Sequence, residues 1–159
     1  SYSLDLSLDG YDEEGSVKSL HDLLVKIDEK VLDHVYENCK ECQGKEYSKD
    51  VLEALYKPMV RVSDKGDYAP TIKLKVGHKD GVFIPEAYTN DKQKTEMSNV
   101  EKGTRCKTLV EIAMIWFIDG KFGPSVRLSQ AMVTPQAKLD GCAFQDEDED
   151  DFETFEDEM

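Results

Sequence analysis

Periodic hydrophobic positions divide the chain into a helical insert and a β-rich remainder. Residues 2–8 alternate apolar and polar side chains, which predicts a strand with one buried face. Over residues 17–39 the apolar side chains recur at intervals of three and four, which predicts a long amphipathic helix. A short second helix is expected over residues 49–56, with Ser48 as its N-cap and an end before Pro58.

After this insert the hydrophobic period changes to two. Further strands are expected at residues 59–63, 71–76, 82–84, 106–118 and 125–133. The clearest alternation lies in the second of these, where Lys73 and Lys75 face away from Ile72, Leu74 and Val76. Residues 86–104 are polar and are expected to form a loop.

The longest apolar stretch predicts a β-hairpin. Residues 106–118 contain no Gly or Pro and are rich in β-branched and aromatic side chains, which pack well on a pleated surface. Asp119-Gly120 supplies the positive φ of a tight turn. Because Pro124 cannot donate to a ladder, the returning strand is expected to begin near Ser125.

The order of these elements predicts a mainly β, α+β fold. Five or six strands, with a helical insert at about residues 16–57, suit a small OB-fold-like barrel formed by residues 1–135. A doubly wound sheet would need helices that alternate with strands, and they do not alternate. Residues 136–159 are expected to be a disordered acidic tail, because they offer little apolar surface to bury.

Charge is distributed unevenly along the chain. The formal net charge is −14, but residues 51–133 hold 13 Lys and Arg against 10 Asp and Glu. Residues 134–159 hold 11 acidic residues against one Lys. Since distant charges are screened beyond about 10 Å at 0.1 M salt, the basic β-rich region is free to bind a polyanion.

The β-rich region combines cations with flat rings, as proteins that bind unpaired nucleic acid do. Phosphates need cations, and bases stack on aromatic side chains. The candidate contacts are Arg61, Lys73, Lys75, Arg105, Lys107, Trp116, Lys121, Phe122 and Arg127. Phe122 is expected to be exposed at the hairpin tip. The alternatives are that Trp116 belongs to the core and that the lysines only protect sheet edges.

Catalysis, cofactors and metals find little support in the sequence. Cys39 and Cys42 form a CxxC, but no second pair follows at zinc-finger spacing, so no metal site is assigned and the thiols are expected to be idle. No common catalytic motif is present, and the chain is not expected to be an enzyme. With no signal peptide or membrane-spanning run in this sequence, an intracellular location is expected and no membrane partner.

A family resemblance rests on segments that follow the helical insert in a fixed order. They are Tyr56-Lys-Pro-Met-Val-Arg-Val62, Pro70-Thr-Ile-Lys-Leu-Lys-Val76, Cys106-Lys-Thr-Leu-Val-Glu-Ile112, Ile115-Trp-Phe-Ile-Asp-Gly-Lys-Phe-Gly123 and Val126-Arg-Leu-Ser-Gln130. In this order the chain resembles the single-stranded DNA-binding proteins of nucleocytoplasmic large DNA viruses. The resemblance implies an OB-fold and binding of single-stranded DNA in replication, recombination or repair. It also implies a location in the host nucleus or at a cytoplasmic replication site.

The acidic tail adds a partner hypothesis and an alternative function. With Phe152 and Phe155 inside its acidic run, the tail is similar in composition to those of bacterial and T7-type phage single-strand binding proteins. That similarity implies contact with replication proteins and competition with DNA. The alternative is an acidic, histone-chaperone-like interaction module that acts through the tail. RNA remains an alternative ligand, and homo-oligomers are left open.

Overall fold

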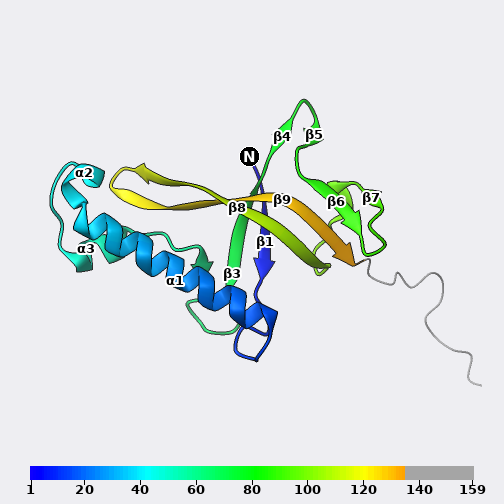
Figure 1. Ribbon diagram of the computed structural model, residues 1–159, viewed down its shortest axis with the longest axis horizontal. Coiled ribbons are helices and arrows are strands. Elements are labelled where there is room, and N and C mark those ends of the chain that lie inside the picture. Colours follow the sequence, from blue (N-terminus) through cyan, green and yellow to red (C-terminus); the bar gives the residue numbers. More distant parts are fainter. Residues whose placement is uncertain (135–159) are drawn as a thin grey trace, which may run out of the picture.

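The computed structural model describes residues 1–134, which form a mainly β structure with a helical insert (Figure 1). The strands are β1 (Tyr2–Ser7), β2 (Val60–Arg61), β3 (Thr71–Val76), β4 (His78–Lys79), β5 (Val82–Phe83), β6 (Glu86–Thr89), β7 (Lys94–Thr95), β8 (Arg105–Ile118) and β9 (Lys121–Thr134). The helices are α1 (Ser16–Glu37), α2 (Cys39–Gln43), α3 (Lys49–Leu55) and the 3₁₀ turn η1 (Met97–Asn99).

One seven-stranded sheet, curled into an open half-barrel, carries most of the chain (Figure 1). Its central strand is β9, which pairs with β8 along its whole length. On its other side β9 pairs in parallel first with β3, where Lys75 is the register partner of Arg127, and then with β6. Strand β3 in turn pairs with β1 and β2, and β7 extends the sheet beyond β6. The separate two-stranded sheet is β4–β5.

The predicted hairpin is confirmed, but its returning strand begins earlier than expected. Asp119 and Gly120 have φ of 51° and 79°, as a tight turn with two left-handed residues requires. The expected start near Ser125 is wrong, because β9 begins at Lys121 and includes Pro124. Pro124 is tolerated there because it adjoins the register shift between Ile112 and Met114, where the ladder is already interrupted.

Helix α1 covers one face of the sheet. Its buried side chain Leu24 joins a core with Ile72 and Leu74 of β3 and with Val126 and Leu128 of β9. The alternation predicted for β3 is therefore confirmed, and its lysines are exposed on the opposite face. We call the uncovered face of the sheet, on which Lys73 and Lys75 lie, the outer face.

A second core closes over the end of the hairpin and overturns one prediction. Phe122, expected to be exposed at the tip, is fully buried with Val35, Cys39, Leu52 and Tyr56. The reason is tertiary: the two short helices of the insert lie beside the hairpin tip (Figure 1), and Gln43 Nε2 donates to the Gly120 carbonyl at 3.1 Å. The insert supplies a core that the local sequence around Phe122 does not reveal.

A buried carboxylate fixes the insert to the sheet. Asp28 of α1 is only 7% exposed and accepts hydrogen bonds from Tyr56 Oη at 2.5 Å and from the Met59 amide at 3.0 Å. The Val60 amide lies at 3.5 Å from the same carboxylate. Because a buried carboxylate is costly unless it is fully hydrogen-bonded, these donors lock α1 against the segment that enters β2.

The long amphipathic helix and the insert between the first two strands are confirmed, but the strands of residues 77–104 were mostly missed. That segment was expected to be a strand at 82–84 followed by a loop, and it contains β4, β5, β6 and β7. These strands have two to four residues each, too few to show a period.

In residues 1–134 no helix has the length and apolar character for a bilayer crossing. The expected tail, 136–159, lies outside the described residues.

Candidate nucleic-acid interface

The sheet register places most of the predicted contact residues on the outer face. Lys73 and Lys75 alternate with buried side chains of β3, so they define that face. Since register partners project to the same side of a sheet, Arg127 lies on the outer face beside Lys75, and Arg61 lies there as the partner of Thr71. Two separate strand pairings thus bring four cations to one surface.

The hairpin extends this surface. Alternation along β9 from Arg127 puts Lys121 on the outer face, together with Trp116, the register partner of Gly123. Lys107 lies four residues before Glu111 on β8 and Arg105 lies six residues before it. Alternation along β8, across the register shift between Leu109 and Val110, therefore puts both on the face of Glu111. The register therefore places every predicted nucleic-acid contact except Phe122 on the outer face.

Phe122 lies on the opposite face of the hairpin. It is 0% exposed and stacks on Phe117 with ring centroids 5.6 Å apart and an interplanar angle of 8°. Its ring is therefore not available to a base. Phe117 and Phe122 are register partners on the face toward the helices, whereas Trp116 lies on the outer face.

A groove runs over the outer face between the hairpin and the strands next to it. It has a volume of about 1060 Å³ and is lined by residues from β1, β3, the segment before β2, and both strands of the hairpin. Among residues 1–134, five Lys or Arg side chains contribute to it and no Asp or Glu does; the five are Lys57, Arg61, Lys73, Lys75 and Arg127. In a chain with 34 acidic and 20 basic residues, this segregation creates a local positive surface.

The cations of this groove are mostly unpaired within the described residues. Lys57, Arg61, Lys73 and Lys75 make no ion pair in residues 1–134. Arg127 approaches Glu111 at 3.9 Å, but both side chains are more than half exposed, so this contact is weak. On the same face Asp5 is the register partner of Lys73 and Glu111 that of Arg127, so the least compensated cations are Lys57, Arg61 and Lys75.

Aromatic rings stand at the groove as well. Trp116 lines it from β8, where it is half-buried. Tyr2 of β1 also contributes to the lining, but as the register partner of Val76 it projects to the face of the sheet opposite Lys73 and Lys75, with 53% of its surface exposed. Tyr2 packs against His78 with ring centroids 4.8 Å apart, and Phe83 completes the cluster. Sequence reasoning missed Tyr2, His78 and Lys57, because they reach the groove through tertiary contacts; only the aromatic start of β1 hinted at a role.

Three predicted contacts lie outside this groove. Arg105, Lys107 and Lys121 are exposed on the outer face but do not line the hollow. Arg105 and Lys107 lie near the far end of the hairpin, next to the last residues of β9, and Lys121 lies at the tip. The outer face therefore carries further cations beyond the lining of the groove.

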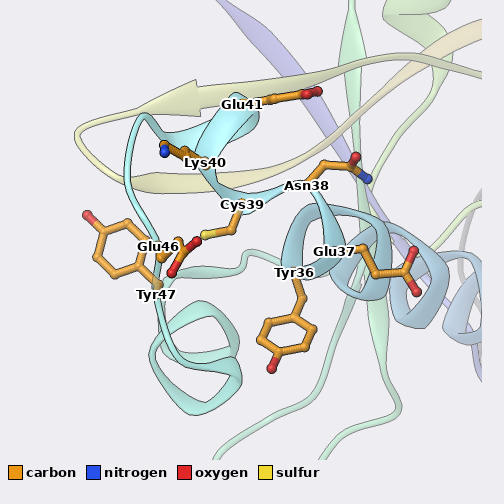
Figure 2. A pocket seen from close by; sticks show the side chains of 8 residues that line it. All are labelled: Tyr36, Glu37, Asn38, Cys39, Lys40, Glu41, Glu46 and Tyr47. Carbon is orange, nitrogen blue, oxygen red and sulfur yellow. The ribbon is translucent and has the colours of Figure 1, made fainter.

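A second, smaller pocket lies in the helical insert and has a different character (Figure 2). It has a volume of about 490 Å³, and acidic side chains dominate its charged lining: Glu37, Glu41 and Glu46 against Lys40. The Cys39 thiol points toward the segment that carries Glu46 and Tyr47 (Figure 2) and donates to the Lys45 carbonyl at 3.2 Å. Within residues 1–134, no group of three or more His, Cys, Asp or Glu side chains fits a metal ion.

The chain was also compared with known proteins. Residues 11–147 match the model of a protein family that is described as a family of unknown function. No curated protein and no solved structure matches the chain.

Proposed function

The chain belongs to the family of unknown function DUF5871, and from the groove on its outer face we propose that it binds single-stranded DNA without sequence preference. The observation that carries this proposal is the lining of the groove, to which the described part of the chain contributes five Lys or Arg side chains, one His and no acidic residue. Such a surface binds a phosphate backbone regardless of sequence, because it contacts charge and not base edges.

The aromatic side chains favour an unpaired strand over a duplex. In a duplex the base faces are stacked inside the helix, whereas a single strand can turn them onto protein rings. Trp116 lines the groove on the same face as Lys73, Lys75 and Arg127, whose charges would hold the flanking phosphates. Each stacked base is worth about 1–3 kcal/mol in proteins of this kind. RNA offers the same phosphates and rings, and it is the alternative ligand.

The proposal extends to the OB-fold and to a role in replication, recombination or repair. A curled sheet that binds a strand across one face is the arrangement used by OB-fold proteins. The half-barrel would then be an OB-fold-like barrel that is not closed, and the helical insert would cover the face of the sheet away from DNA. The resemblance to viral single-stranded DNA-binding proteins supports the same assignment.

A second candidate function rests on the acidic end of the sequence. Residues 134–159 carry 11 acidic side chains and one Lys, a composition suited to binding a basic protein. In that chaperone-like alternative the β domain would be a scaffold, and its basic groove would have no ligand. The segregation of cations into the groove favours the DNA hypothesis.

Titration of a fluorescent oligo-dT of about thirty nucleotides, long enough for more than one site, tests the proposal. We expect binding that weakens steeply between about 50 and 200 mM salt. A Lys73→Glu/Lys75→Glu variant should lose most of the affinity. Lys30→Glu/Lys40→Glu, with the same charge change in the exposed part of the helical insert, should retain more of it. Absence of binding at low salt, or equal losses in the two variants, would contradict the proposal.

A further inference from the structure

Strand β8 forms a long, open edge of the sheet. It pairs with β9 on one side, and its other side has no partner strand in residues 1–134 (Figure 1). From Arg105 to Ile112 β8 itself has no extra residue, because the register shift between Leu109 and Val110 places the extra residue, Ser129, on β9. The free edge of β8 therefore presents a continuous run of backbone donors and acceptors there. Open edges of this kind are templates for pairing with another strand.

The side chains of this regular stretch are complementary to themselves. In an antiparallel pair of two copies centred on Leu109, Lys107 of each copy lies opposite Glu111 of the other. Leu109, which is 61% exposed in the single chain, then lies opposite its own counterpart at the two-fold axis. Opposite charges and apolar pairs across neighbouring strands are the contacts that stabilise sheets.

We propose that β8 pairs antiparallel with β8 of a second copy, around a two-fold axis at Leu109. Such an interface is isologous, as in most homodimers. This assignment is independent of the proposed function, because it is tested without nucleic acid.

The pairing has a geometric consequence for the outer face. Register partners share a face, so the outer faces of the two copies lie on the same side of one continuous sheet. At the axis Lys107 and Glu111 of the two copies pair, and Arg105 of each copy lies opposite Ala113 of the other, between the two grooves. A dimer would place both basic grooves on one side of a single continuous sheet.

Charge reversal tests the register directly. In sedimentation equilibrium of the full chain over a concentration series, we expect dimers that Lys107→Glu and Glu111→Lys each weaken. Each change replaces two attractive pairs with repulsive ones, about a tenfold increase in dimer Kd. Mixing the two single variants should restore dimers, because the Glu at 107 and Glu111 of one chain then face the Lys at 111 and Lys107 of the other. The double variant Lys107→Glu/Glu111→Lys should also dimerise.

Arg105→Glu is the matched control, because Arg105 faces Ala113 in this register. It should dimerise like the unaltered chain, and mixed with Glu111→Lys it should restore dimers no better than the unaltered chain does. Leu109→Asp, at an exposed position, should give monomers that keep the circular dichroism of the parent. A chain that is monomeric throughout the series overturns the proposal. So do single variants with unchanged dimerisation, or rescue of Glu111→Lys by Arg105→Glu in place of Lys107→Glu.

Discussion

Lys75 and Arg127 are register partners in the parallel pairing of β3 with β9, so two cations stand side by side on the outer face. Like charges at directly opposed positions destabilise a sheet. Lys75 makes no ion pair within the described residues, and the only one of Arg127 is the long contact with Glu111. A bound phosphate would relieve this repulsion, which links the stability of the sheet to its proposed ligand.

Replacing Lys75 with Met should therefore separate stability from binding. We expect the free energy of unfolding to stay the same or rise, because the repulsion from Arg127 is removed. Affinity for oligo-dT should fall, and the slope of log K against log salt should decrease by about one phosphate contact. Urea denaturation and salt-dependent anisotropy measure the two effects. Lys30→Met, on the exposed side of α1, is the control and should leave the slope unchanged.

Trp116 should act as a stacking residue. Trp116→Ala should weaken oligo-dT binding by about 1–3 kcal/mol, and Trp116→Phe should restore much of the loss because a ring is kept. Tyr2→Ala is the control: Tyr2 projects to the opposite face as the register partner of Val76, so this change should leave the affinity nearly unchanged. Trp116 is the only Trp, so quenching of its fluorescence by DNA reports contact directly. Full affinity in Trp116→Ala would show that the ring is structural.

The carboxylate of Asp28 should be a main determinant of stability. Asp28→Ala leaves the Tyr56 hydroxyl and the Met59 amide buried without an acceptor, so we expect a loss of about 3–5 kcal/mol in the free energy of unfolding. Tyr56→Phe should cost about 1–2 kcal/mol, since the backbone donor remains. Tyr88→Phe is the control: its hydroxyl binds Glu86 at 2.6 Å near the surface and should matter little. Urea denaturation measures all three.

Tyr56 should also make stability fall at alkaline pH. Burial, and then its hydrogen bond to Asp28, raise the pKa of Tyr56 above the ordinary value of 10.0. Above that pH the unfolded chain loses this proton and the folded chain keeps it, so the contribution of Tyr56 is present below about pH 10 and declines above it. Comparing the pH dependence of unfolding with that of Tyr56→Phe isolates the effect; parallel curves above pH 10 would contradict it.

Removal of residues 145–159 should tighten DNA binding. This segment contains only acidic charges, and tethering would keep it at roughly millimolar effective concentration near the basic groove. We expect the gain in affinity to be largest at low salt. Phe152→Ala/Phe155→Ala preserves the charge, so it should leave the affinity for DNA unchanged. It should weaken the binding of any replication protein that contacts these two rings. Equal affinity with and without the segment would rule out the competition.

Local patterns predicted the elements whose pattern is long or chemically specific. The 22-residue helix α1, the lysine face of β3 and the Asp119-Gly120 turn all carry strong local signals. The parallel pairings of β9 with β3 and β6 carry none, because nothing local specifies which distant strands meet. For the same reason the candidate cations were found, whereas Lys57 and Tyr2 were missed.

At Phe122 a local pattern led to a wrong prediction. Its neighbours Lys121 and Gly123 are residues typical of an exposed hairpin tip. The burial of Phe122 depends instead on helices that belong to a different part of the chain. At Gly123 the backbone before β2 also passes so closely that a methyl group would overlap the Lys57 carbonyl oxygen. Hydrophobic burial at such a site is decided by tertiary packing and not by sequence neighbours.

The central position of β9 also bears on how the chain folds during synthesis. Strands β3, β6 and β8 all pair with β9, and so does the backbone at Tyr56, yet β9 is the last of these segments to be made. Until Lys121–Thr134 leaves the ribosome, the earlier strands have no common partner, and their contacts span long stretches of chain. Such non-local pairing slows folding and leaves apolar edges exposed to aggregation. Nascent chains stalled before Lys121 should therefore depend on chaperones, and release of β9 should complete the sheet in one cooperative step.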